Sequence, residues 1–323
     1  MFSPTMKENF KPDALPMRNL SIVIPVYNEA LTLAALLHRL NAMAETLPDV
    51  SVEYVFVDDH SQDDSFFILQ QFAEQDDRIR IIRLNKNRGS HMAIFTGMMN
   101  CRGDVVCTIP ADLQTPPELV PDMLAKLKEG YRTVWAYRRT RNGDRRTLFF
   151  SRLYDRLMDR FILPGRWNKG ADVFLIERSI IPDICRQWRP KGNLFALLAW
   201  LNIKPVEIGY DQEARYAGES KWSFWAKCKL LLDTLFTFSP IVLRILMALG
   251  LLLTLGGFVF LNAIPNIADH WAHLTAAIIL LVCGVQFVVL SIAVEYIWRI
   301  TNRPNDLSAD YIEKKIGFPE NRQ

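Results

Sequence analysis

Short apolar runs alternate with longer amphipathic segments through the first third of the chain. The runs are rich in β-branched residues and have the length of strands, at residues 20–27, 52–58, 79–84 and 105–109. The segments between them repeat apolar residues with the period of a helix, at residues 29–47, 64–75 and 91–101. Apolar strands that alternate with helices predict an α/β fold whose sheet is mostly parallel, Rossmann-like and covered on both faces.

The last third of the chain has a different pattern. Residues 241–264 and 274–298 are each long and apolar enough to span a hydrocarbon core of roughly 30 Å. No Lys or Arg lies between Arg244 and Arg299, whereas basic residues flank the two segments on the outside. The positive-inside rule then predicts a transmembrane hairpin with both ends in the cytoplasm. Two buried helices of a soluble core are the alternative.

A further amphipathic segment precedes this hairpin. Residues 221–240 place Trp222, Trp225 and Leu232 on one helical face and lysines on another, as in helices that lie among lipid headgroups. A core helix of the soluble domain is the alternative. The expected order is an N-terminal tail, an α/β domain, a juxtamembrane helix, the hairpin and a cytoplasmic C-terminal tail, at residues 1–19, 20–220, 221–240, 241–298 and 299–323.

The amino-acid composition argues against several classes of function. A hydrophobic content of 50% suits a soluble domain that carries a small membrane portion, and a net charge of +3 argues against nucleic acid as a partner. The five cysteines form no C-x-x-C pair, so neither zinc nor a disulfide framework is indicated. The first twenty residues contain charges and prolines without an apolar core, so we expect a cytoplasmic N-terminus.

The polar residues that follow the predicted strands are the candidates for a binding site, because ligands of open α/β sheets bind at the carboxyl ends of strands. After the first strand, the absence of glycines argues against a dehydrogenase. Tyr27 could instead offer its ring to a base and Glu29 could accept hydrogen bonds from ribose hydroxyls, although the segment is also a reasonable helix entry. Asp58 and Asp59 end the second strand and could accept hydrogen bonds from a base and a sugar. A helix N-cap is the competing interpretation.

The third and fourth strands are followed by candidates for phosphate and metal binding. The basic turn at residues 84–91, with Gly89 at the start of a helix, could meet a diphosphate or be a solvated turn. Asp112 and Gln114 project to the same side of an extended chain. Their oxygens, with phosphate oxygens and water, would suit Mg²⁺ or Mn²⁺, unless the prolines around them simply shape a structural turn.

The order of these motifs is more specific than any one of them. VIPVYNE, VDDHS, LNKNRGSHMAIFTG and ADLQTPPE follow successive strands, and this series resembles the family-2 glycosyltransferases with the GT-A fold. The later GESKWSF segment and the hairpin make the chain similar to polyprenyl-phosphate glycosyltransferases, such as dolichol-phosphate mannose synthase and bactoprenol glucosyltransferase. The resemblance covers residues 20–303. It implies inverting transfer of a sugar from a nucleotide, with UDP favoured by analogy, to undecaprenyl phosphate for cell-envelope glycans such as lipopolysaccharide.

The resemblance also implies roles for individual residues. The nucleoside and its phosphates would be held by Pro25, Tyr27, Glu29, Asp58 and Gly89, and a Mg²⁺ or Mn²⁺ ion by Asp112 and Gln114. The residues implied in catalysis are Asp112, Asp172, Arg138, Arg215 and Lys221. Among these, Arg138 corresponds to an arginine near the transferred phosphate. Asp172 matches the family's G-D-F-R-L segment with one residue inserted and Phe174 in place of arginine. Arg215 and Lys221 would clamp the lipid phosphate.

Two further residues, in and beside the metal-binding motif, depart from the family pattern. The family usually has D-x-D-x-Q, and here Pro110 replaces the first Asp, while Thr115 replaces the Asp of L-Q-D-P. The loss of a carboxylate should weaken metal binding, because hard divalent ions depend on ligand charge. Either Asp112 and Gln114 suffice, or the nucleotide is held differently, or the chain is a degenerate homologue that acts as a lipid-phosphate-binding membrane scaffold.

The remaining expectations concern an alternative enzyme class, the cellular location of the protein and its binding partners. A processive polysaccharide synthase would need a Q-x-x-R-W motif and more membrane helices, whereas this chain has Gln187-Trp188-Arg189 and one hairpin. We expect a multi-pass protein of the bacterial inner membrane with its α/β domain in the cytoplasm. Its expected partners are a nucleotide-sugar, a polyprenyl phosphate and membrane lipid. Small residues in the hairpin, Gly250, Gly256 and Gly257, would also permit a homo-oligomer.

Overall fold

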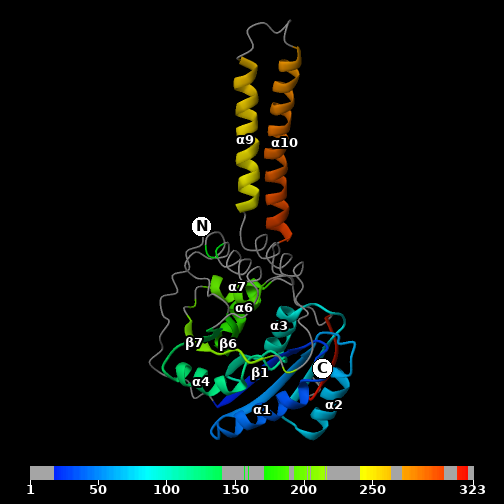
Figure 1. The fold of residues 1–323 in the computed structure, drawn as a ribbon, viewed down its shortest axis with the longest axis vertical. Coiled ribbons are helices and arrows are strands. Elements are labelled where there is room, and N and C mark those ends of the chain that lie inside the picture. Colours follow the sequence, from blue (N-terminus) through cyan, green and yellow to red (C-terminus); the bar gives the residue numbers. More distant parts are fainter. Residues whose placement is uncertain are drawn as a thin grey trace.

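An α/β domain lies at one end of a pair of long antiparallel helices in the computed structural model (Figure 1). The structure describes residues 18–139, 156, 159, 171–188, 193–201, 203, 205–214, 216, 241–262, 271–301 and 311–318. The predicted juxtamembrane helix at 221–240 lies outside these residues.

Eight strands form one sheet in the order β7-β5-β6-β4-β1-β2-β3-β8. The strands are β1 (Asn19–Val26), β2 (Ser51–Asp58), β3 (Ile79–Leu84), β4 (Val105–Thr108), β5 (Thr133–Arg138), β6 (Ala171–Glu177), β7 (Val206–Tyr210) and β8 (Ile312–Ile316). Strand β1 pairs in parallel with β2 and β4, β2 with β3, and β5 with β7. Only β6 and β8 run antiparallel to their neighbours. The predicted mostly parallel α/β sheet is confirmed.

The directions of the eight strands decide which strand ends lie at the edge of the sheet where ligands bind. Because β6 is antiparallel to both β4 and β5, strand β5 has the same direction as β4, and so does β7. The carboxyl ends of six strands and the amino ends of β6 and β8 therefore lie along the same edge of the sheet, which we call the carboxyl edge.

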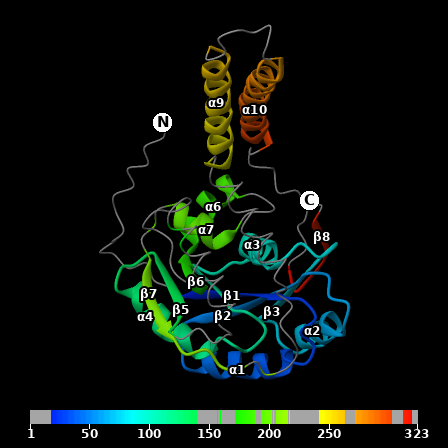
Figure 2. The same cartoon turned by 45° about the horizontal axis from the view of Figure 1, so that its top comes forward.

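Helices cover both faces of the sheet, as the hydrophobic pattern predicted. Among the described residues, the helices of this domain are α1 (Leu33–Glu45), α2 (Ser65–Gln75), α3 (Ser90–Asn100), α4 (Val120–Lys128), α6 (Ile181–Gln187) and α7 (Leu194–Trp200). Alternate residues of β1 enter opposite cores, with Ile22 and Ile24 packed with α1 and α4, and Val23 packed with α3, α6 and α7. Figure 2 shows α3, α6 and α7 on the side of the sheet that faces the long helices, and α1 on the other.

A glycine lets α3 approach the sheet closely. A Cβ atom at Gly97 would collide with the side chains of Val23 and Val57, on β1 and β2. The absence of a side chain therefore brings the helix against the two central strands. Its first turn, which follows the basic turn at 85–89, lies at the carboxyl edge as a result.

The two long helices have the features of membrane-spanning segments. They are α9 (Ile241–Asn262) and α10 (Trp271–Thr301). Their spans Arg244–Asn262 and His273–Ile297 have mean hydropathies of 2.2 and 2.8 and are mostly exposed, so they are long and apolar enough to cross a membrane. Gly250, Gly257 and Gly284 lie where the two helices touch, whereas Gly256 faces open space. Small residues thus allow close packing within the hairpin.

The segment expected as a C-terminal tail contains β8, which extends the sheet antiparallel to β3. Its sequence, IEKKI, places isoleucines at both ends, and Ile312 and Ile316 pack against the two cores of the domain. Burial of these side chains explains why the chain returns to the sheet after the hairpin. Part of the stretch 299–323 is therefore joined to the α/β domain.

Candidate active site

The backbone is unusual at the carboxyl edge. Three non-glycine residues among those described have positive φ: Asn28 (53°), His60 (62°) and Leu113 (58°). They lie shortly after β1, β2 and β4 respectively. Such conformations cost on the order of 1–3 kcal/mol and are typically retained at binding or catalytic sites, especially for a branched apolar side chain such as leucine.

Asp58 is the most buried acidic residue of this edge. It ends β2, its side chain is fully buried, and its Oδ1 accepts a hydrogen bond of 3.1 Å from the Ser61 amide. Its Oδ2 has no hydrogen-bond partner among the described residues, and Arg83 Nε lies 3.6 Å away, at ion-pair distance. Burial raises the pKa of this carboxyl group. A buried acceptor without a donor is suited to receive an N–H group from a ligand.

Asp59 ties the end of β2 to the basic turn before α3. Its two oxygens accept hydrogen bonds from the Arg88 and Gly89 amides, at 2.6 and 2.7 Å. Gly89 has φ 90° and ψ 155°, a conformation that is open essentially to glycine alone. The predicted phosphate-binding turn is thus held by Asp59, for which sequence analysis had considered a contact with a base or a sugar.

The predicted nucleoside residues of β1 lie at the same edge. Pro25 is in register with Val57 of β2, and Tyr27 and Glu29 follow the strand as half-buried residues. The Glu29 amide donates a hydrogen bond of 2.8 Å to Ser65 Oγ, which fixes the turn into α1. The sheet therefore brings these three residues to the edge that also carries Asp58, while their contacts with a nucleoside stay a prediction.

The predicted metal residues lie in the turn after β4. Asp112 Oδ1 accepts a hydrogen bond of 3.2 Å from the Gln114 amide across the left-handed Leu113. No three His, Cys, Asp or Glu side chains in the described part of the chain form a metal-binding group. A single carboxylate and an amide still fit Mg²⁺, which is usually held by one or two carboxylates together with substrate phosphates and water.

Arg138 and Asp172, which sequence analysis named separately, form an ion pair. Arg138 Nε lies 2.5 Å from Asp172 Oδ2 across the β5–β6 pair. The Tyr210 hydroxyl, on β7, donates to the same oxygen at 3.2 Å. Burial, together with the negative charge of Asp172, raises the pKa of Tyr210 to about 12, so the phenol keeps its proton. Arg138 Nη1 also donates to Gln212 at 3.2 Å.

Thr115 occupies a structural position in this network. Its side chain is buried, and its hydroxyl lies 3.1 Å from the Tyr210 hydroxyl. Because the phenol proton is directed at Asp172, the threonine acts as the donor to Tyr210. The residue that replaces the family's aspartate thus links the turn after β4 to the end of β7. Nothing in the sequence pattern pointed to Tyr210.

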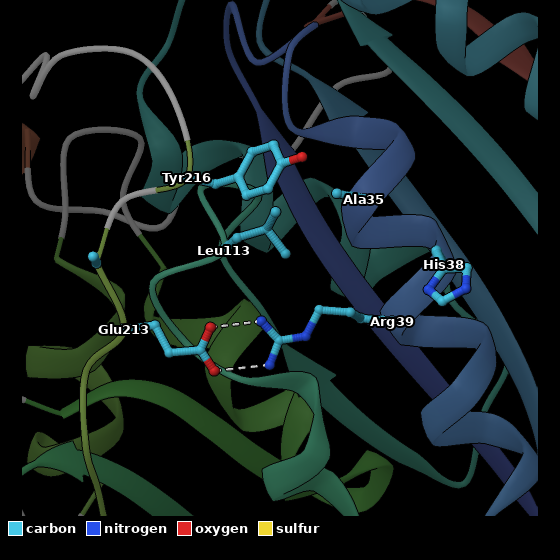
Figure 3. Close-up of a pocket in the computed structure, with 7 residues that line it drawn as sticks. Ala35, His38, Arg39, Leu113, Glu213 and Tyr216 are labelled. Atoms are coloured by element: carbon cyan, nitrogen blue, oxygen red, sulfur yellow. Dashed lines mark hydrogen bonds and ion pairs between the residues drawn. The ribbon is translucent and has the colours of Figure 1, made fainter.

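A cluster of one arginine and two glutamates lies beside this link, with the arginine on α1. Arg39 forms two hydrogen bonds with Glu118 and two with Glu213, all between 2.7 and 3.0 Å. Arg39 and Glu213 line one pocket of about 380 Å³. Figure 3 shows the two side chains bonded to each other, with Leu113 and Tyr216 farther along the pocket. Sequence analysis missed this cluster, because its members are up to 174 residues apart. Two other predicted residues, Arg215 and Lys221, lie outside the described residues.

Comparison with known proteins agrees with this arrangement. The model of the family "Glycosyl transferase family 2" matches residues 21–185, about half of the chain. The chain belongs to glycosyltransferase family 2. Its α/β domain accordingly has the GT-A fold, and the carboxyl edge, which carries the family motifs, is the candidate active site of a glycosyltransferase.

Similar proteins extend over nearly the whole chain. An uncharacterized glycosyltransferase of Bacillus subtilis is 31% identical over 94% of this chain and 95% of its own length. An undecaprenyl-phosphate 4-deoxy-4-formamido-L-arabinose transferase of Klebsiella pneumoniae is 32% identical over 94% of this chain and 96% of its own. A crystal structure of mannosyl-3-phosphoglycerate synthase from Rubrobacter xylanophilus matches 67% of this chain and 71% of its own, with a TM-score of 0.49 and 17% identity.

Proposed function

We propose that this glycosyltransferase moves a sugar from a nucleoside diphosphate, with UDP as the favoured nucleotide, onto undecaprenyl phosphate at the cytoplasmic face of the bacterial inner membrane. The strongest support is the Klebsiella pneumoniae relative, whose name states this acceptor and whose similarity includes the hairpin. The two apolar helices beside the catalytic domain suit a substrate whose chain is dissolved in the membrane. The product would be a lipid-linked sugar for cell-envelope glycans.

The donor would bind along the carboxyl edge, with its base at β2. The buried Asp58 Oδ2, which has no described donor, would accept a hydrogen bond from a base N–H. Tyr27 and Glu29 would contact the nucleoside, and the turn at Gly89 would meet the diphosphate with its backbone amides. Asp59 would serve this turn indirectly, because its carboxylate fixes the Arg88 and Gly89 amides.

A divalent ion is part of the proposal, with Asp112 and Gln114 as its ligands from the chain. When bound, Mg²⁺ or Mn²⁺ would neutralise the charge that develops on the departing nucleoside diphosphate. Pro110 leaves this site with one carboxylate fewer than the family pattern. We therefore expect weak metal binding in the absence of the nucleotide, whose phosphates supply the missing negative charge.

The acceptor requires little activation, because a phosphate monoester is mostly dianionic near pH 7, given a second pKa of about 6. Arg215 and Lys221 would hold this phosphate, and Arg138 would assist. Asp172 would keep the Arg138 guanidinium in place through their ion pair. A single displacement at the anomeric carbon would then invert its configuration, with orientation as the main catalytic contribution.

The test is the transfer of radiolabelled sugar by the purified protein into undecaprenyl phosphate, with Mg²⁺, Mn²⁺ or EDTA. The donors should include nucleotide-linked glucose, mannose and 4-deoxy-4-formamido-L-arabinose. We expect metal-dependent labelling of the lipid by one donor, and a loss of at least about a hundredfold with Asp112→Ala, because ligand charge is removed from the site.

A second candidate function is that of a degenerate membrane scaffold. The observation in its favour is the loss of two of the family's carboxylates, with Pro110 at one position and the buried Thr115 bonded to Tyr210 at the other. A scaffold would bind nucleotide or lipid phosphate without turnover. Measurable nucleotide binding without labelling from any donor would therefore exclude the enzyme and favour this alternative.

A further inference from the structure

The segment after β7 is held to the active site by arginines. Three consecutive side chains, Asp211, Gln212 and Glu213, each accept a hydrogen bond from a different arginine: Arg139, Arg138 and Arg39. Two of these arginines belong to the end of β5 or follow it, whereas Arg39 reaches across from α1. The direction of this segment is thus set by charged contacts from separate elements.

Arg39 differs from the other two arginines because it also binds Glu118, in the short 3-10 helix Pro117–Leu119 that follows the turn of Asp112. Its Nε and Nη2 donate to both oxygens of Glu118, at 3.0 and 2.7 Å. Its Nη1 and Nη2 donate to both oxygens of Glu213, at 2.7 and 2.9 Å. A planar guanidinium can bridge two carboxylates in this way, and a lysine ammonium cannot.

The segment has little apolar packing that could replace this bridge. A pocket of about 380 Å³ separates it from α1, and the ring of Tyr216 at the rim is 66% exposed. Glu213 is otherwise joined to the metal turn by one backbone hydrogen bond, from its amide to the Gln114 carbonyl, at 3.1 Å. Polar contacts over a pocket therefore fix its position (Figure 3).

We propose that Arg39 is a positioning residue that sets the acceptor side of the active site relative to the donor side. In the sequence, Arg215 follows Glu213 by two residues and Lys221 by eight, so the bridge fixes the start of the segment that supplies the proposed phosphate clamp. This inference rests on the proposed function. A bidentate network of this kind also contributes to stability, so the test measures the unfolding temperature beside the acceptor kinetics.

The experiment compares four variants in the full-length protein, with nucleotide-sugar and undecaprenyl phosphate varied separately. Arg39→Ala is expected to raise the KM for undecaprenyl phosphate or lower kcat by on the order of ten- to a hundredfold. The dissociation constant for UDP should change less than about twofold, because the contacts of Asp58 and Gly89 are retained. Arg39→Lys should recover only part of the activity. Glu213→Gln should resemble Arg39→Ala, whereas Glu118→Gln should be milder because the contact with the segment remains.

The matched control is Arg78→Ala. Arg78 also forms a bidentate contact, with Asp76, on the surface of the domain, but it precedes β3 and lies at the opposite edge of the sheet. It should leave both KM values and kcat unchanged. The combination of Arg39→Ala with Glu213→Gln should be no worse than Arg39→Ala alone, since both remove the same contact.

Two results would overturn the inference. If the wild-type protein transfers sugar and Arg39→Ala leaves the acceptor kinetics unchanged, Arg39 does not position the segment. If Arg39→Ala weakens UDP binding as much as it impairs acceptor use and lowers the unfolding temperature, its role is general stability. Absence of transfer by the wild-type protein would instead count against the proposed function, so the two failures are distinguishable.

Discussion

The raised pKa of Asp59 makes a residue of the proposed donor site sensitive to pH. Burial, opposed by the hydrogen bonds from Arg88 and Gly89, raises its pKa from 3.8 to about 6. The folded protein therefore binds this proton more tightly than the unfolded chain does. The contribution of Asp59 to stability is fully present below about pH 4 and is lost as the pH rises through 6.

Replacing this carboxyl group should flatten the pH dependence of stability. For Asp59→Asn, we expect the unfolding temperature to vary less between pH 4 and pH 7 than it does in the wild-type protein. The variant should also bind UDP-sugar more weakly at pH 7, because an amide cannot accept hydrogen bonds with both of its terminal atoms. Thermal unfolding in detergent at several pH values, with calorimetric binding at pH 7, tests both points. Parallel pH profiles for the two proteins would contradict the assignment.

The position of the candidate residues was predictable where a strand end marked them, while their roles stay predictions. Pro25, Tyr27, Glu29, Asp58 and Asp112 lie at or after the ends of strands whose apolar pattern is unambiguous, and the parallel sheet brings them to one edge. Contacts between distant residues carry no such local signal. The bridge from Arg39 to Glu118 and Glu213 and the bonds of Tyr210 depend on the packing of β7 and α1 beside the turn after β4.

At the scale of elements, β8 and the residue before it, Tyr311, contact residues beside the proposed donor site. The Tyr311 carbonyl accepts a hydrogen bond of 3.0 Å from the Asn85 amide, and the Arg88 guanidinium lies 4.0 Å from the Tyr311 ring centre. Glu313 lies 3.5 Å from Arg83, the partner of Asp58. The strand that follows the hairpin thus supports the residues that hold the proposed nucleotide.

Removal of the Tyr311 ring should therefore weaken donor binding. A cation–π contact contributes roughly 0.5–1 kcal/mol at a partly exposed site, so Tyr311→Ala is expected to raise the dissociation constant of UDP about two- to fivefold. Phe318→Ala is the control, because Phe318 lies beside Arg80 near the other end of the strand pair. Calorimetric titration of both variants makes the comparison. Equal affinities for the two variants would mean that Tyr311 has no specific role.

The elements differ in how far the sequence specifies them. Strands β1 to β4 and helices α1 to α3 were predicted to within a few residues, because each has a long and regular apolar period. Strand β8 was missed, since IEKKI exposes two lysines and gains its stability from an edge of β3 that is distant in the sequence. Antiparallel β6 was missed for a similar reason, because its partners β4 and β5 are brought to it by the fold.

At the scale of the whole molecule, the hairpin lies on the side of the catalytic domain that carries α3, α6 and α7. The helices α3, α6 and α7 lie between the sheet and the long helices (Figure 2). The chain enters α9 from the domain and, after α10, returns to the same domain as β8. Both ends of the hairpin are therefore on the side of the catalytic domain, in agreement with the basic residues that flank it outside.

This arrangement predicts which positions are accessible from each side of the membrane. In a cysteine-free background, Asp269→Cys, between the two spans in the sequence, should react with an impermeant maleimide in intact cells freed of their outer membrane. Lys128→Cys, at an exposed position of α4 in the catalytic domain, should react only after the inner membrane is permeabilised, because the basic flanks predict that this side faces the cytoplasm. Each variant should first be shown to retain transfer activity. Labelling of Lys128→Cys in intact cells would reverse the orientation, and labelling of neither position before permeabilisation would mean that the helices do not cross the membrane.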